Sequence, residues 1–144
     1  MTSILTYNVK GIRQAKKRIN IFHYLKNYVQ NGIICLQETH STPADEMLWE
    51  AEWGGSLYFS HGESNAKGVL IGISKNFCPN ITKISRDTNG RILIIELDFD
   101  NHKCLFINFY NANTDKEQLS ALKELDQLLS DFDLNNVIPF FLAI

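Results

Sequence analysis

Glu38 stands where the chain passes abruptly from apolar residues into a cluster of polar side chains. The apolar run Ile33-Ile34-Cys35-Leu36 leads directly into Gln37-Glu38-Thr39-His40. An uninterrupted apolar run of this length is typical of a strand buried on both faces. In open α/β sheets, ligands bind beyond the carboxyl ends of such strands. Glu38 is therefore the first candidate for chemistry, although a lone Glu at a strand end is more often a plain surface residue.

Asn8 is expected to lie at the same edge of the sheet as Glu38. Residues 3–8 predict a short strand, and the apolar spacing within residues 16–30 predicts a helix that ends at Asn31-Gly32. A strand, a helix and a second strand make a βαβ unit, whose two strands run parallel. The amide of Asn8 and the carboxylate of Glu38 would then face one cleft. Taken alone, Asn8 is more often a turn residue.

The second half of the chain predicts an antiparallel meander and another crossover. A short helix at 43–53 and a strand at 57–60 precede strands at 68–74, 81–85, 91–99 and 103–110, with Asn89-Gly90 as a hairpin signal. Thr114 to Glu117 fits a capping box that begins a helix ending near residue 130. A last strand is predicted from Phe140, because Pro139 lacks a backbone N–H. Tyr110 would end a strand at a comparable rim, although a lone tyrosine there is more often a half-buried aromatic.

Composition places the chain among single globular domains. Its 144 residues are 44% hydrophobic and 21% charged, and no apolar run approaches the roughly 20 residues that span a bilayer, so no membrane partner is expected. The N-terminus lacks the basic start and apolar core of a signal peptide. Cys35, Cys78 and Cys104 are an odd, scattered set, typical of a reducing compartment. We therefore expect an intracellular protein, nuclear or cytoplasmic, that is not secreted.

Charge restricts how the chain would meet nucleic acid. The net charge of −2 argues against a strongly basic nucleic-acid coat, but it leaves room for local action through a few cations. The main basic feature is the cluster Lys10, Arg13, Lys16, Lys17 and Arg18. Such a cluster is either a phosphate patch or the solvated start of a helix.

Three motifs in the expected order resemble the endonuclease/exonuclease/phosphatase superfamily. They are Thr6-Tyr7-Asn8-Val9-Lys10-Gly11, Cys35-Leu36-Gln37-Glu38-Thr39-His40 and Asn108-Phe109-Tyr110-Asn111-Ala112-Asn113-Thr114. Within the superfamily, the sequence most resembles the endonuclease domain of LINE-type (non-LTR) retrotransposons. Gly68-Val69-Leu70-Ile71 and Asn89-Gly90-Arg91-Ile92 also stand where that family has its middle strands.

The resemblance implies a metal-dependent phosphodiester hydrolase that nicks DNA. It implies Mg²⁺, with Mn²⁺ as the alternative ion, bound by Glu38 and with Asn8 as a neighbour of the metal or phosphate. It places Tyr110 against the scissile phosphate and Asn113 in the family's Tyr-x-x-Asn position, where Ala112 replaces the usual proline. Further phosphate or DNA contacts are expected from Arg91, Lys10 and Arg13, although Arg91 would pair equally well with a carboxylate.

The resemblance also implies an α/β fold, the N-terminal part of a deoxyribonuclease-like four-layer α/β sandwich. We expect a mixed sheet with helices on one face, and an inner face left apolar and open toward the missing second sheet. Residues 1–144 would be an incomplete domain, truncated before a Gly-Asp-x-Asn motif, because the chain stops at the end of an apolar strand. The remainder of the domain, and a downstream reverse transcriptase, would then be partners besides DNA.

The expected truncation predicts that this polypeptide alone is inactive or nearly so. The family's later Asp and Asp-His groups, which activate water and stabilise the transition state, are not in the chain, and in-line attack needs a positioned base. Two alternatives stay open. One is another phosphoesterase of the superfamily, either an abasic-site repair endonuclease or a lipid or inositol phosphatase; the other is a non-catalytic relic or interaction fragment. A nucleotide-binding module is disfavoured, since residues 8–12 offer one glycine where G-x-G-x-x-G needs three.

Overall fold

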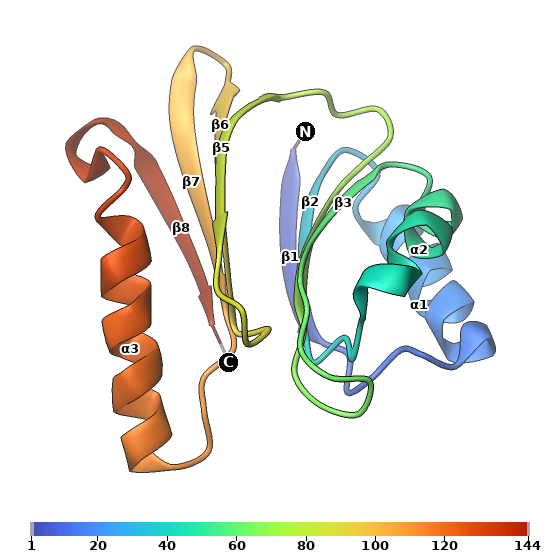
Figure 1. Ribbon diagram of the computed structural model, residues 1–144. Helices are drawn as coiled ribbons and strands as arrows, with labels where there is room; N and C mark the ends of the chain where they lie inside the picture. Colours follow the sequence, from blue (N-terminus) through green and yellow to red (C-terminus); the bar gives the residue numbers. More distant parts are fainter. Residues whose placement is uncertain (1, 144) are drawn as a thin grey trace.

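The computed structural model describes residues 2–143, which fold into two four-stranded sheets with helices on their outer sides (Figure 1). In chain order the elements are β1 (Ser3–Asn8), α1 (Ala15–Tyr28), β2 (Gly32–Gln37), the 3-10 turn η1 (Pro43–Asp45), α2 (Glu46–Trp53), β3 (Ser56–Ser60), β4 (Val69–Ile73), β5 (Asn80–Arg86), β6 (Ile92–Phe99), β7 (His102–Phe109), α3 (Asp115–Leu129), the 3-10 turn η2 (Leu134–Asn136) and β8 (Ile138–Ala143). Within these residues no helix has the length and apolar character needed to cross a membrane.

The first sheet has the strand order β1-β2-β4-β3. β1 and β2 are parallel and the other pairs are antiparallel. β2 is buried along its whole length, as its uninterrupted apolar run predicts. Because α1 crosses between two parallel strands, the predicted βαβ unit is confirmed. The residues that follow β1 and β2 therefore meet at one rim, the lower edge of the sandwich in Figure 1.

The second sheet has the strand order β5-β6-β7-β8. Its first three strands form the predicted antiparallel meander, and α3 then crosses to β8, which is parallel to β7. Thr114 caps α3, since its hydroxyl accepts a hydrogen bond from the Glu117 N–H at 3.3 Å. β8 begins at Ile138, two residues before its predicted start, and includes Pro139. An edge strand tolerates proline, and β8 pairs with β7 alone among the described residues. The predicted strand end at Ile144 lies outside them.

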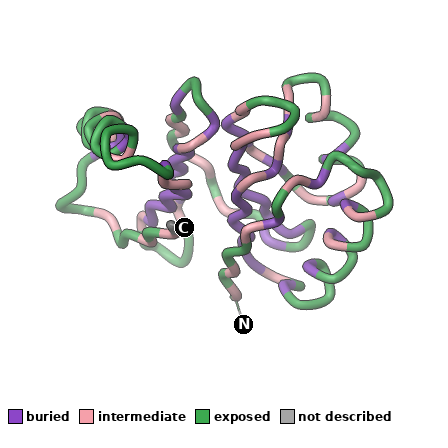
Figure 2. Tube along the Cα trace, turned by 90° about the horizontal axis from the view of Figure 1, so that it is seen from below, coloured by how far each residue is buried: buried purple, intermediate pink, exposed green. Residues whose placement is uncertain are grey.

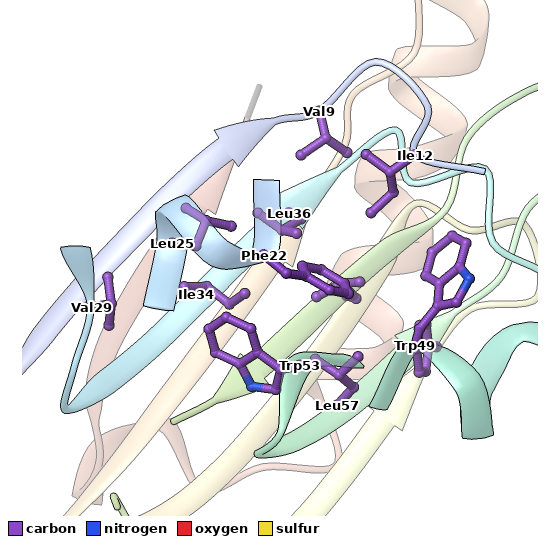
Figure 3. Packing of buried hydrophobic residues seen from close by; sticks show 12 residues of the cluster. Val9, Ile12, Phe22, Leu25, Val29, Ile34, Leu36, Trp49, Trp53 and Leu57 are labelled. Atoms are coloured by element: carbon purple, nitrogen blue, oxygen red, sulfur yellow. The ribbon is translucent and has the colours of Figure 1, made fainter. Parts of the chain in front are cut away.

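The outer face of the first sheet is covered by α1 and α2. Phe22, Trp49 and Trp53 fill this layer (Figure 3), and the rings of Phe22 and Trp53 meet edge to face at 5.8 Å. Full burial of such a side chain contributes about 1.5–3 kcal/mol. Arg18 ties the two helices together, because its guanidinium donates to Glu52 at 2.7 Å and lies over the ring of Trp49.

The inner faces of the two sheets pack directly on each other. Buried side chains from both sheets form one cluster there, and Figure 2 shows buried positions along the central strands of both sheets. α3 covers the outer face of the second sheet through Ala121 and Leu125. The predicted four-layer α/β sandwich is thus confirmed, with two mixed sheets that each carry helices on one face.

The prediction that the chain supplies mainly one sheet, with an open inner face, is wrong. Strands β5 to β8 supply the second sheet that covers this face. The reason lies in β6, which is apolar on both sides: Leu93 and Ile95 face the first sheet, while Ile92 and Ile94 face α3. A strand that is apolar on both sides belongs between two layers, not at an exposed surface.

Candidate active site

Glu38 and Tyr110 come from different sheets and meet at the rim. Glu38 follows β2 and Tyr110 follows β7. The Tyr110 hydroxyl donates a hydrogen bond to Glu38 Oε1 at 2.5 Å, and both residues are half-buried. A hydrogen bond to a carboxylate is stronger than one between neutral groups. This contact therefore joins the two sheets at the point where the sequence predicted chemistry.

Arg91 packs against Tyr110 and contributes a positive charge. Its guanidinium carbon lies 5.5 Å from the centre of the Tyr110 ring, and the Tyr110 N–H donates to the Arg91 carbonyl at 2.8 Å. Burial of the phenol, reinforced by the hydrogen bond to Glu38, raises the pKa of Tyr110 to about 12, although Arg91 acts in the opposite direction. Tyr110 is therefore a neutral hydrogen-bond donor at physiological pH.

An open cleft of about 420 Å³ lies in front of Glu38. Among the described residues that line it, three are cations (Lys10, Lys67 and Arg91) and one is a carboxylate, Glu38. The other lining residues are His40, Asn65, Ala66, Tyr110 and Asn113. A cleft lined mainly by one sign of charge concentrates ligands of the opposite sign. The cleft is therefore suited to an anion such as a phosphate group.

Asn8 and Arg13 lie outside this lining. Asn8 Oδ1 accepts a hydrogen bond from the Lys10 N–H at 3.0 Å and so shapes the turn, in which Lys10 has a φ of +51°. The Arg13 guanidinium donates to Asp45 at 2.5 Å and to the His40 carbonyl at 3.2 Å, which anchors η1 to the rim. Of the seven site residues predicted from the sequence, the fold thus gathers five in the cleft. The catalytic, metal and DNA roles of all seven residues stay predictions.

Two fully buried amides tie the sheets together behind the site. Asn108 on β7 donates to the carbonyls of Leu36 and Leu70 at 3.1 and 2.8 Å, and its Oδ1 accepts from Gln37 Nε2 at 2.8 Å. Sequence reasoning gave these two residues no role. The available signal was a polar side chain within an otherwise apolar strand, since a buried polar group must find a partner.

A buried aspartate that sequence reasoning also missed positions Arg91. The Asp87 carboxylate accepts hydrogen bonds from the N–H groups of Arg91 and Ile92 at 3.2 and 3.0 Å, and from the Ser60 hydroxyl at 2.7 Å. Asp87 is 6% exposed. Its place two residues before Asn89-Gly90 was the available signal, because aspartate side chains often bond to nearby turn backbone.

A sequence profile of the Endonuclease/Exonuclease/phosphatase family matches residues 5–138. The chain belongs to this family. The predicted superfamily is therefore confirmed, and one curated relative agrees with the retrotransposon resemblance. The "Transposon TX1 uncharacterized 149 kDa protein" of Xenopus laevis is 27% identical over 138 residues. That match covers 94% of this chain and 10% of the transposon protein.

Solved structures share the fold of this family member. Humanized D. rerio TDP2 with 14 mutations matches with a TM-score of 0.70 at 17% identity, covering 97% of this chain and 64% of that one. The endonuclease domain of TRAS1, a telomere-specific non-LTR retrotransposon, matches with a TM-score of 0.62 at 13% identity, covering 96% and 58%. At these identities the matches show the fold alone. The chain spans less than two thirds of either structure and about a tenth of the transposon protein.

The site suits a hard cation that keeps much of its own water. One oxygen of Glu38 accepts the Tyr110 hydroxyl, and no side chain within residues 2–143 donates to the other. The described residues contain no group of three or more His, Cys, Asp or Glu side chains that would enclose a metal. Mg²⁺ binds through one or two carboxylates plus water and phosphate oxygens. Glu38 meets that requirement, and the Asn8 amide oxygen keeps one lone pair besides the one used by Lys10.

Proposed function

We propose that this chain carries part of a divalent-metal-dependent phosphodiester hydrolase that nicks DNA, as the endonuclease of a retrotransposon. The observation that carries the proposal is the Glu38–Tyr110 hydrogen bond within a cleft lined by three cations. Membership of the family and the similarity to a transposon protein support it. A place in the nucleus or cytoplasm is part of the same proposal.

Each cleft residue has a role that follows from its chemistry. Glu38, with the Asn8 amide, would hold a Mg²⁺ or Mn²⁺ ion, which would polarise the phosphate and stabilise charge on the leaving oxygen. The Tyr110 hydroxyl orients the Glu38 carboxylate and is a neutral donor beside the phosphate. Lys10 and Arg91 bind phosphate oxygens through charge-assisted hydrogen bonds. The Asn113 amide lines the same cleft and positions the substrate.

We further propose that this polypeptide by itself cleaves DNA very slowly or not at all. Attack on phosphorus in line with the leaving group needs a base that activates a positioned water. His40 is the imidazole in the described cleft lining, but its Nδ1 packs against Gly11, where an added Cβ would lie 2.5 Å away. The rest of the domain, which would supply the base, and a downstream reverse transcriptase are the proposed partners besides DNA.

DNA binding tests the proposal without requiring turnover. Fluorescence anisotropy with a labelled duplex should show binding that Mg²⁺ strengthens and that Glu38→Gln makes insensitive to Mg²⁺. Arg91→Gln should weaken DNA binding. It should also reduce, by about 1, the magnitude of the slope of log binding constant against log salt concentration, as the loss of one phosphate contact does. Lys123→Gln, which removes one charge from exposed α3, is the matched control and should behave like the wild type. Equal effects of Arg91→Gln and Lys123→Gln would contradict the proposal.

The downstream reading frame separates the alternatives. If the reading frame continues after Ile144 with a Gly-Asp-x-Asn motif, the longer protein that it encodes is the sample to use in a cleavage assay. Nicking of intact supercoiled plasmid supports the retrotransposon endonuclease, whereas cleavage restricted to abasic duplexes, or to inositol phosphates, favours the other phosphoesterases. Absence of DNA binding would favour a non-catalytic relic.

A further inference from the structure

The loop that carries Glu38 has an unusual backbone conformation. Glu38 and His40 have φ values of +55° and +57°, in the left-handed region that is unfavourable for residues other than glycine. Such conformations persist only where the surroundings enforce them. Thr39, between the two, is fully buried, and its N–H donates to the Gly68 carbonyl at 3.0 Å. Gly68 leaves room for the Thr39 hydroxyl, since an added Cβ would lie 2.4 Å from that oxygen.

A chain of hydrogen bonds leads from Thr39 to the surface of the molecule. Thr39 Oγ1 lies 2.9 Å from Ser41 Oγ, and Ser41 Oγ lies 3.0 Å from His61 Nδ1. His61 Nε2 lies 2.7 Å from Glu46 Oε2, at the start of α2. The His61 ring stacks on Phe59 with centroids 5.0 Å apart. The chain therefore links the Glu38 loop to α2 through a histidine from the distant loop after β3.

The donors and acceptors of this chain follow from its outer end. In the tautomer that donates Nε2–H to the Glu46 carboxylate, His61 Nδ1 accepts a hydrogen bond from the Ser41 hydroxyl. Ser41 Oγ accepts in turn from the Thr39 hydroxyl, whose oxygen also accepts the Ser41 N–H at 3.3 Å. Each of these polar atoms has a partner, and the buried part of the network, Thr39 and Ser41, is held rigidly by it.

The hydrogen-bonded series Ser41, His61 and Glu46 has the order of groups of a serine–histidine–acid triad, but it is not a nucleophilic site. Ser41 is 0% exposed, so no substrate reaches its Oγ. We propose instead that His61 is a positioning residue, which holds Thr39 through Ser41 and thereby maintains the left-handed turn that aims Glu38 at Tyr110 and at the metal. This inference rests on the proposed function, because it takes Glu38 as the metal ligand.

The test uses the whole chain with ¹³Cζ-labelled tyrosine and Mn²⁺ alone as the probe. His61→Phe keeps a ring on Phe59 but removes both hydrogen bonds, whereas His61→Asn keeps an acceptor for Ser41. We expect His61→Phe to weaken Mn²⁺ binding about tenfold, as the loss of a residue supporting a metal ligand does. The metal-free Tyr110 resonance should move toward its position in Glu38→Gln. His61→Asn should restore part of both properties.

Two further variants separate positioning from general destabilisation. Leu128→Ala weakens the packing of α3 far from the rim and should leave the Tyr110 resonance and Mn²⁺ affinity unchanged. Glu46→Gln alters the exposed end of the hydrogen-bond chain and should shift the Tyr110 resonance and the Mn²⁺ affinity in the direction expected for His61→Phe. It keeps the proposal testable if His61→Phe does not fold. The proposal would be overturned if His61→Phe or Glu46→Gln kept the wild-type Tyr110 resonance and Mn²⁺ affinity, or if Leu128→Ala changed them equally. A wild type that does not bind Mn²⁺ would refute the proposed function instead, and the metal-free resonance would still test His61.

Discussion

Replacing Asn108 with alanine removes the buried amide that joins the two sheets behind the rim. The side chain makes three hydrogen bonds, two to backbone carbonyls of the first sheet and one to Gln37. At about 1–1.5 kcal/mol for each hydrogen bond, the variant should lose about 3–5 kcal/mol of unfolding free energy. In a domain of this size each kcal/mol corresponds to about 3 °C, so the melting temperature should fall by about 10–15 °C.

Urea unfolding followed by the fluorescence of Trp49 and Trp53 measures this loss. The matched control is Asn80→Ala on β5, which removes one exposed contact to Asp98 at 3.4 Å and should change stability by less than about 0.5 kcal/mol. A loss below about 1 kcal/mol for Asn108→Ala, or a loss equal to that of the control, would refute the role of this amide as the connection between the sheets.

Three further predictions concern titration and capping. Because the pKa of Tyr110 is raised to about 12, its protonated form contributes stability that is fully present below about pH 10 and is lost as pH rises through 12. Tyr110→Phe should abolish this alkaline loss in urea titrations, and a difference from the wild type that is independent of pH would contradict it. Burial alone would raise the pKa of Asp45, but hydrogen bonds from the Thr42 backbone and from Arg13 hold it below its usual value. The stability that Asp45 contributes is therefore present above about pH 4 and lost below it. Asp45→Asn should reduce the change in melting temperature between about pH 2 and 5, as measured by thermal melts. Thr114→Ala should lower stability by about 1 kcal/mol while Thr114→Ser does not, as measured by circular dichroism melts.

Local pattern predicted the parts of the fold that depend on neighbouring residues. The apolar run of β2 marked a strand buried on both faces, and the helical spacing after β1 marked a parallel crossover. Thr114 was correctly predicted as the cap of α3. These features are set by hydrogen bonds and burial within a few residues, so they can be read in sequence order.

The parts that sequence missed depend on contacts between distant elements. The strand at 91–99 was predicted, but its apolar residues on both faces, Ile92 and Ile94 as well as Leu93 and Ile95, were not used to place it in a second sheet. The rim positions of Glu38 and Tyr110 were predicted separately, but their mutual contact depends on how the sheets stack. No pattern in the sequence indicated a role for His61, because its partners Ser41 and Glu46 become neighbours only in the folded chain.

Binding of Mn²⁺ near Tyr110 tests the central claim most directly. The chain has five tyrosines, so a ¹³Cζ-tyrosine spectrum resolves one probe at the site and four elsewhere. If Glu38 binds a divalent ion beside Tyr110, substoichiometric Mn²⁺ should broaden the Tyr110 resonance before the others, and Glu38→Gln should abolish this selectivity. Uniform broadening of all five resonances, or the same selective broadening in Glu38→Gln, would contradict a metal site at Glu38.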